Sequence, residues 1–123
     1  MKVFIVVLLI VVVFLVLHYL FPVIQICGDS MYPTYKGGEI LLGYRIYRKD
    51  HLKVGDVILF QNTEDRRTVI KRIADIREEK GKLLFFVLGD NPEVSYDSRN
   101  YGYISSDRLT CRLFNQRRKL ECM

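Results

Sequence analysis

The chain begins with a long apolar segment. Residues 3–17 carry apolar side chains throughout, and the next four residues extend the segment to about 19 residues, or about 28 Å of α-helix. That length is close to the ~30 Å hydrocarbon core of a bilayer. Tyr19 and Phe21 are aromatic residues of the kind found at membrane interfaces. We therefore expect residues 1–22 to form a transmembrane anchor.

After the anchor, short apolar runs alternate with turn residues. The runs are rich in β-branched and aromatic side chains, and Gly, Asp and Asn separate them. This pattern predicts strands over residues 39–44, 57–60, 68–73 and 83–88. Helix signals are weak, and at most residues 107–114 would form a short helical turn. The fold class predicted is mainly β, with residues 23–123 forming one small sandwich or barrel.

A cleavable secretory signal is the alternative interpretation of the apolar segment. Such signals have an apolar core of about 7–15 residues before a site with small side chains. Here the run is longer, and residues 22–27 offer no such site. An uncleaved anchor is therefore favoured. The short N-terminal flank favours a cytoplasmic N-terminus, which predicts a single-pass protein of the plasma membrane with an extracytoplasmic domain.

Two basic clusters, residues 44–49 and 117–119, follow the anchor in a chain of net charge +5. Cations interleaved with tyrosines can bind nucleic acid, but a membrane-tethered domain has a nearer anionic partner in lipid headgroups. We expect these clusters either to contact the lipid bilayer or to form a solvated surface. We do not expect them to bind nucleic acid.

The cysteines and the acidic residues show no metal-ligand spacing, and the sequence has no phosphate-binding glycine loop. No metal and no cofactor are therefore expected. Cys111 and Cys122 could pair outside the cytoplasm, which would leave Cys27 free. The odd number of cysteines leaves any disulfide open.

Ser30 lies on a predicted turn directly after the anchor. A Gly-Asp pair precedes it and Pro33 follows it, so the stretch by itself is typical of a surface turn. A nucleophilic serine needs a base. Neither histidine suits that role, because His18 lies in the anchor and His51 in a charged loop.

Lys71 is the lysine that stands within a β-branched apolar run. Burial disfavours a charged ammonium and lowers the pKa of a lysine by up to 3–5 units. An ordinary lysine of pKa about 10.4 is neutral about one time in 10³ at pH 7.4, whereas a depression of about three units makes it a competent base. The alternative is a lysine on a strand edge that points to solvent and pairs with a carboxylate.

Three stretches stand in order behind the anchor: residues 30–34 (Ser-Met-Tyr-Pro-Thr), the pair Lys71-Arg72, and residues 89–99 with Gly-Asp-Asn at the start and Ser-Tyr-Asp-Ser-Arg at the end. In this order they resemble the boxes of bacterial type I signal peptidases, the Ser/Lys-dyad S26 peptidases. Residues 54–58 are similar to the box between the first two. The resemblance extends from the anchor to Gly102.

The resemblance implies a role for each matching residue. Ser30 would be the nucleophile and Lys71 its general base, and Ser95 would orient the Lys71 amine. The backbone N–H of Ser30 would supply one oxyanion donor. Gly28 stands where some members carry a hydroxyl, so the second donor stays open between backbone and water. The supporting ion pairs implied are Asp90 with Arg72 and Asp97 with Arg99.

The family fold implies a β-domain that lies on the membrane and binds the preprotein in an extended conformation. Its shallow pockets would accept small side chains such as Ala at the first and third positions before the cut. The segment between Arg72 and Gly89 is too short for the large second β-domain of some members. Each pocket residue could instead belong to the core; the five are Ile24, Ile26, Met31, Val69 and Ile70.

The sequence thus predicts a membrane-anchored serine endopeptidase that removes signal peptides from exported preproteins. Two alternatives stay open. One is a dedicated Ser/Lys processing peptidase of a conjugation or secretion system. The other is an inactive membrane-tethered β-domain that only binds exported peptides, although retention of both Ser30 and Lys71 argues against it.

Overall fold

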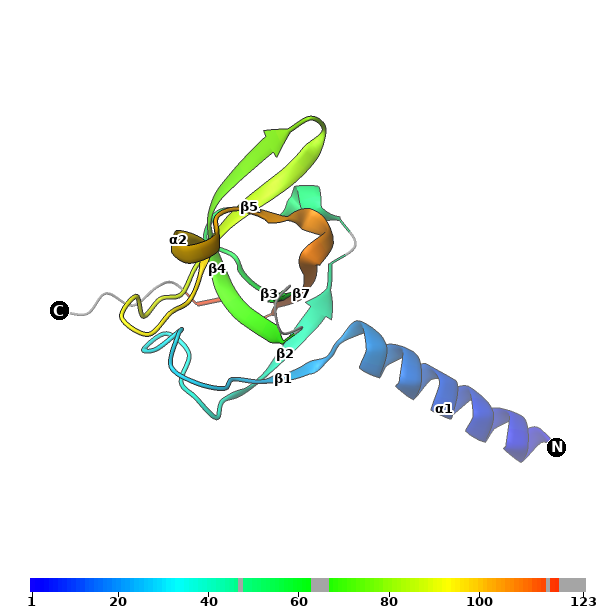
Figure 1. Ribbon diagram of the computed structural model, residues 1–123. Helices are drawn as coiled ribbons and strands as arrows, with labels where there is room; N and C mark the ends of the chain where they lie inside the picture. Colours follow the sequence, from blue (N-terminus) through cyan, green and yellow to red (C-terminus); the bar gives the residue numbers. More distant parts are fainter. Residues whose placement is uncertain (47, 63–66, 115, 118–123) are drawn as a thin grey trace.

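The computed structural model describes residues 1–46, 48–62, 67–114 and 116–117 (Figure 1). One helix precedes a seven-stranded sheet in the order β1-β2-β7-β3-β4-β5-β6. The elements are α1 (Lys2–Leu20), β1 (Val23–Gln25), β2 (Ile40–Arg45), η1 (Lys49–His51), β3 (Val57–Gln61), β4 (Thr68–Glu79), β5 (Lys82–Leu88), α2 (Ser98–Tyr101), β6 (Ile104–Ser105), η2 (Ser106–Arg108) and β7 (Leu109–Leu113).

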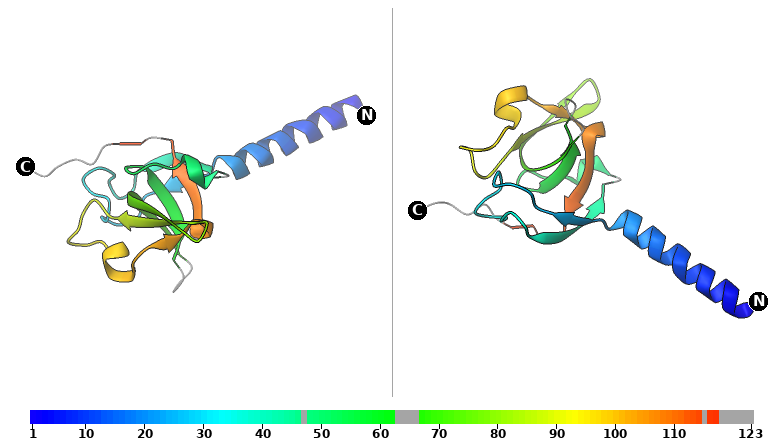
Figure 2. Two further views of the ribbon diagram at one scale, coloured as in Figure 1. Left: turned by 90° about the horizontal axis from the view of Figure 1, so that it is seen from above. Right: turned by 60° about the horizontal axis from the view of Figure 1, so that its bottom comes forward.

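The helix α1 projects away from the sheet in every view (Figures 1 and 2). None of its 19 residues is buried, although nearly all of them are apolar. By length and composition α1 could cross a membrane. A helix that is apolar on all sides is suited to lipid, where its backbone hydrogen bonds are satisfied internally. The helix therefore fits the expected membrane anchor.

The prediction of a mainly β fold is confirmed, because the strands pair antiparallel throughout the described sheet. The four predicted strands correspond to β2, β3, β4 and β5, and β4 continues beyond its predicted end to Glu79. A two-residue turn at Lys80 and Gly81 joins β4 to β5, and both residues have positive φ, as a type I′ hairpin requires. This hairpin lies in the segment between Arg72 and Gly89, which the sequence predicted to be too short for a large second β-domain.

The prediction of a helical turn over residues 107–114 is wrong for most of its length. Only η2 is helical there, and residues 109–113 form β7, which lies between β2 and β3. Leu109, Cys111 and Leu113 are buried while the two residues between them are half-exposed. Such a period of two is typical of a strand with one face on the core. The strand was missed because Thr110 and Arg112 interrupt its apolar character.

Two clusters of buried side chains make up the core. The first joins β1, β2, β3 and β7 to the loop after β1, and includes Met31, Tyr35 and Leu113. The second lies between β3, β4, β5 and β6, around Phe60 and Phe85. Residues 26–39 connect β1 to β2, so the first cluster holds the loop that carries Ser30 against the sheet.

Candidate active site

The loop that carries Ser30 is fixed by its own buried residues. Met31 and Tyr35 are 1% and 0% exposed, and the Tyr35 N–H donates to the Met31 carbonyl. Gly38 N–H donates to the Ile26 carbonyl and closes the loop. Ser30 itself stays half-exposed beside these anchors. The side chain of Ser30 is therefore presented to solvent from a loop whose next residue is locked in the core.

Lys71 lies on β4 and reaches Ser30 from across the sheet. Its Nζ is 3.0 Å from Ser30 Oγ, and the residue is only 2% exposed. Lys71 shares the inward face of β4 with Ile73, which is also buried. Burial lowers the pKa of Lys71, and the charge of Asp97 opposes this by raising it. The lysine thus does not point to solvent, which was the alternative interpretation of its position.

Ser95 lies beside the pair, but its hydrogen bond differs from the one expected. Ser95 Oγ donates to Asp97 Oδ2 at 2.7 Å. Within the described part of the chain, the hydrogen-bond partner of the Lys71 amine is Ser30 and not Ser95. The reason is that Asp97 is a charged acceptor close to Ser95 along the chain, and a carboxylate accepts more strongly than an amine.

Gly89 allows this close packing. A Cβ at Gly89 would overlap Ser95 Oγ, and it would lie 2.5 Å from Ser95 Cβ and 2.7 Å from the carbonyl oxygen of Ser30. Position 89 therefore has no space for a side chain. The absence of one brings the end of β5 against both serines.

Two ion pairs hold the segment that follows β5. Arg72 Nε and Nη2 donate to the two carboxylate oxygens of Asp90 at 2.9 and 2.8 Å. Arg99 binds both oxygens of Asp97 in the same way, at 3.0 and 2.6 Å. Asp90 and Asp97 are both buried. The structure thus brings together each predicted pair, and the paired fork geometry fixes the segment to β4 and to the start of α2.

Asp97 is the centre of this segment. It is 0% exposed, accepts from the Gly89 N–H at 2.9 Å, and caps α2 by accepting from the Arg99 N–H at 3.1 Å. Burial alone would raise its pKa, but the donors from Arg99, Gly89 and Ser95 outweigh that and hold the pKa of the carboxyl well below its ordinary value. Asp97 is therefore ionised, and its negative charge faces the region of Lys71.

Asn91 is a site residue to which sequence reasoning gave no role. Its backbone N–H donates to the Ser30 carbonyl at 2.8 Å, and its side-chain Nδ2 donates to the Asp29 carbonyl at 3.0 Å. These two bonds hold the two peptide groups that flank the Cα of Ser30. Its position directly after Gly89-Asp90 could have identified it from the sequence, because a polar stretch at the end of a buried strand is a common place for site residues.

Arg117, from the second basic cluster, also holds the serine loop. It donates to the Thr34 carbonyl at 2.9 Å, and it pairs with Glu39 at 2.8 Å. Its backbone N–H donates to the hydroxyl of Tyr35. Residues 118 and 119 lie outside the described residues. Arg117 thus ties the end of the described chain to the loop between β1 and β2.

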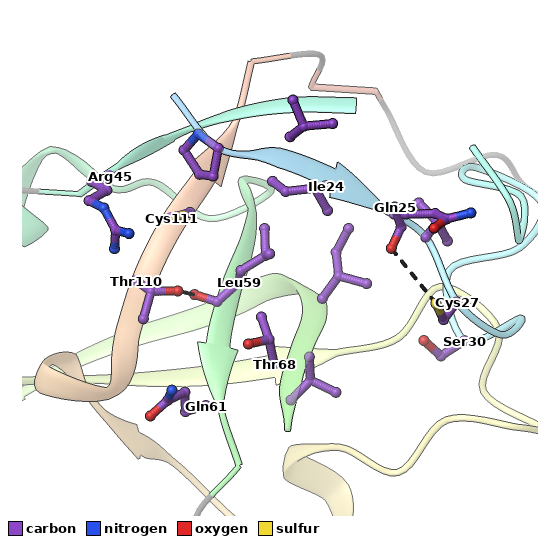
Figure 3. A pocket seen from close by; sticks show the side chains of 15 residues that line it. Ile24, Gln25, Cys27, Ser30, Arg45, Leu59, Gln61, Thr68, Thr110 and Cys111 are labelled. Atoms are coloured by element: carbon purple, nitrogen blue, oxygen red, sulfur yellow. Dashed lines mark hydrogen bonds between the residues drawn. The ribbon is translucent and has the colours of Figure 1, made fainter. Parts of the chain in front are cut away.

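A cavity of about 510 Å³ opens beside Ser30 (Figure 3). Four of the five predicted pocket residues line it: Ile24, Ile26, Val69 and Ile70. Met31 does not, because it points into the first core cluster. Cys27 and Cys111 line the cavity as free thiols, the first exposed and the second buried. Cys122, with which Cys111 could pair, lies outside the described residues.

The cavity lies between two strand edges. In the described sheet β1 pairs only with β2, and residues 68–71 of β4 pair only with β3, since pairing with β5 starts at Arg72. Unpaired backbone groups on both edges are suited to an extended peptide. In the described residues, His, Cys, Asp and Glu side chains form no group of three that could hold a metal ion.

A family model for signal peptidase, peptidase S26, matches residues 1–76. The chain belongs to this family. The matched residues include α1, Ser30 and Lys71, and they make up more than half of the chain. Among curated proteins none matches the chain. As an S26 peptidase the protein has a signal-peptidase type of function, and its N-terminal helix fits the membrane association of that family.

Proposed function

We propose that the protein is a membrane-anchored serine endopeptidase that removes signal peptides from exported preproteins. Ser30 is the nucleophile and Lys71 the general base. The observation that carries the proposal is the 3.0 Å separation of Lys71 Nζ and Ser30 Oγ, with the amine buried and its pKa lowered. In this reading α1 anchors the enzyme in the plasma membrane, and the sheet lies outside the cytoplasm.

The chemistry begins with the neutral Lys71 amine. As Ser30 Oγ attacks the carbonyl carbon of the substrate, Nζ takes the hydroxyl proton, and the new C–O bond gives a tetrahedral intermediate. The Lys71 ammonium then gives that proton to the leaving amine as the peptide bond breaks. A water molecule, deprotonated by the same amine, hydrolyses the acyl-enzyme and restores Ser30.

The oxyanion is stabilised by the backbone N–H of Ser30. The bonds from Asn91 to the Asp29 and Ser30 carbonyls support this role, since they fix the peptide plane that contains this N–H and the plane that follows it. Gly28 has a φ of 80°, a left-handed conformation that strains any L side chain. The second donor is therefore backbone or water and not a side chain at position 28.

The substrate binds as an extended strand between the edges of β1 and β4. Ile24, Ile26, Val69 and Ile70 wall the cavity beside Ser30, and branched side chains on both walls leave room for small residues such as Ala. An added methylene in an apolar pocket changes selectivity by about 10–200-fold, so this lining supports a preference for cleavage after Ala-x-Ala.

The test is cleavage of a preprotein with an Ala-x-Ala site by the full chain in detergent. Ser30→Ala and Lys71→Ala should each lose activity by at least about 10³-fold, because removal of one member disables the pair. Lys80→Ala, which removes an exposed lysine from the hairpin turn, is the matched control and should retain full activity. Equal activity in all variants would refute the pair. An inactive parent that still binds the preprotein would point to a peptide-binding domain instead.

A further inference from the structure

A second cavity, of about 470 Å³, does not have Ser30 in its lining, although Arg45 lines both cavities. It is formed by the end of β2 and the residue after it, by η1 with its flanking residues, and by Arg112 of β7. Its lining is strongly basic: Arg45, Arg48, Lys53 and Arg112 face a single carboxylate, that of Asp56. We refer to it as the basic cavity.

The charges of the basic cavity are only partly compensated. Asp56 pairs with Arg112 at 3.2 Å and accepts from the backbone N–H of Lys53 at 3.0 Å. Arg48 pairs with Asp50, but both side chains are more than half exposed, so the pair is weak. The Lys53 ammonium makes no ion pair with any described residue. The cavity therefore keeps an excess of positive charge.

Lys49 belongs to the same basic run but does not line the cavity. Its Nζ turns inward and donates to the carbonyls of Leu109 and Ile46, at 2.7 and 3.4 Å. Burial lowers the pKa of Lys49 as well. One cation of the run thus fixes η1 against β7, whereas Arg45 and Arg48 remain on the cavity wall.

The basic cavity adjoins the point where α1 meets the sheet. Arg45 Nε donates to the Tyr19 carbonyl at 2.7 Å, and the guanidinium lies 3.9 Å from the centre of the Tyr19 ring. Tyr44, also in the lining, packs on Phe114, which stacks on Phe21. Figure 2 shows α1 leaving the sheet at this side. With α1 in a bilayer, the cavity lies at the level of the lipid headgroups.

We propose that the basic cavity binds the phosphate of an anionic phospholipid from the membrane that α1 spans. Guanidinium and ammonium groups are the usual protein donors to phosphate. A zwitterionic headgroup is disfavoured, because its own cation would face Arg48 and Lys53. The proposal requires α1 to be a membrane anchor, but it does not depend on the roles of Ser30 and Lys71.

The experiment uses the full chain in a nonionic detergent and short-chain dihexanoyl phosphatidylglycerol as the probe. Binding is measured by titration calorimetry, with the heat of transfer into protein-free micelles subtracted. Dihexanoyl phosphatidylcholine and inorganic phosphate are titrated in parallel. The variant Arg48→Gln/Lys53→Gln removes two exposed cations from the cavity. Its matched control, Arg77→Gln/Lys82→Gln, removes two exposed cations from the β4–β5 hairpin.

We expect one phosphatidylglycerol per chain, bound at least tenfold more weakly by the cavity variant and within twofold of the parent by the control. Phosphatidylcholine should bind at least tenfold more weakly than phosphatidylglycerol. An equal loss in both variants would overturn the site in favour of general electrostatic attraction. If inorganic phosphate bound as tightly as phosphatidylglycerol, the proposal that the bound phosphate belongs to a lipid would be overturned.

Three further measurements serve as controls. Both double variants change exposed side chains, so their thermal unfolding midpoints should match that of the parent, and the single variant Lys53→Gln should show an intermediate affinity. Cleavage of the preprotein in lipid-free detergent should be the same in the cavity variant and the parent. Loss of lipid binding with intact cleavage therefore separates this site from the peptidase chemistry.

Discussion

Gly89→Ala provides a sharp test of how the site is held together. The new Cβ would overlap Ser95 Oγ and would lie 2.5 Å from Ser95 Cβ and 2.7 Å from the Ser30 carbonyl oxygen. Since unstrained contacts between such atoms are about 3.5 Å, Ser95 must move by about 1 Å, and the Ser30 carbonyl by somewhat less. The substitution therefore displaces both the loop that carries Ser30 and the side chain of Ser95 with a single methyl group.

The expected cost can be divided between stability and activity. Inserting a methyl group into a closely packed site costs about 1–3 kcal/mol of unfolding free energy. A shift of about 1 Å at a reacting group costs about 10²-fold in rate. We therefore expect kcat/KM for preprotein cleavage to fall about 10²-fold at a temperature where Gly89→Ala is still folded. Calorimetric unfolding of the same samples gives the folded fraction for the correction.

Phe85→Leu is a suitable control, because Phe85 is fully buried in the second core cluster, whose contact with a predicted site residue is made through half-buried Val69 at its margin. It should lower stability by about 1 kcal/mol and leave kcat/KM within about twofold of the parent. If Gly89→Ala lost stability but kept its activity within twofold, the packing of Ser95 and the Ser30 carbonyl would be irrelevant to catalysis. The close approach at Gly89 would then have a structural role only.

The remaining predictions concern the base, an ion pair and the cavity. Lys71→Met should abolish cleavage yet stabilise the fold by about 1–4 kcal/mol in urea unfolding near pH 6, because it removes a buried amine. Folding lowers the pKa of Lys71, so between the folded and unfolded pKa values the unfolded chain binds more protons than the folded chain. The stability of the parent therefore rises with pH in that range. The stability gained by Lys71→Met should become smaller over the same range. The parent's kcat/KM should rise with pH as Lys71 loses its proton, with a midpoint below the ordinary lysine value of about 10.4, and a flat profile would rule out Lys71 as the base. Asp90→Ala leaves the Arg72 guanidinium, 12% exposed, without its carboxylate, and should cost about 3–5 kcal/mol in thermal unfolding, whereas exposed Glu93→Ala should change it by less than about 0.5 kcal/mol. Ile70→Ala should widen the cavity and raise cleavage after Val relative to Ala by about tenfold, and an unchanged ratio would remove Ile70 from the pocket wall.

The sequence alone was sufficient for the parts of the fold that have a local cause. Residues 3–17 are apolar without interruption, so a helix exposed on all sides and suited to lipid follows from composition and length. The strands β2, β3, β4 and β5 were predictable because each is a compact β-branched or aromatic run between turn residues. The strand β7 also has a local signal, the alternation of apolar and polar residues over 109–113, and it was missed because Thr110 and Arg112 interrupt the apolar run.

For the site, the sequence determined which residues are chemically suited to act, and only the tertiary structure decided how they meet. A lysine within an apolar run indicates burial of Lys71, but its 3.0 Å approach to Ser30 depends on a loop and a strand 41 positions apart in the chain. The same holds for Asn91, whose bonds to Asp29 and Ser30 join the loop after β5 to the loop after β1, and for Met31, which packs in the first core cluster and not in the cavity. Ser95 is the exception, because its acceptor Asp97 lies only two positions away along the chain and a carboxylate accepts more strongly than an amine. Local sequence records what a side chain can do, whereas its partner is selected by packing between segments that are remote along the chain.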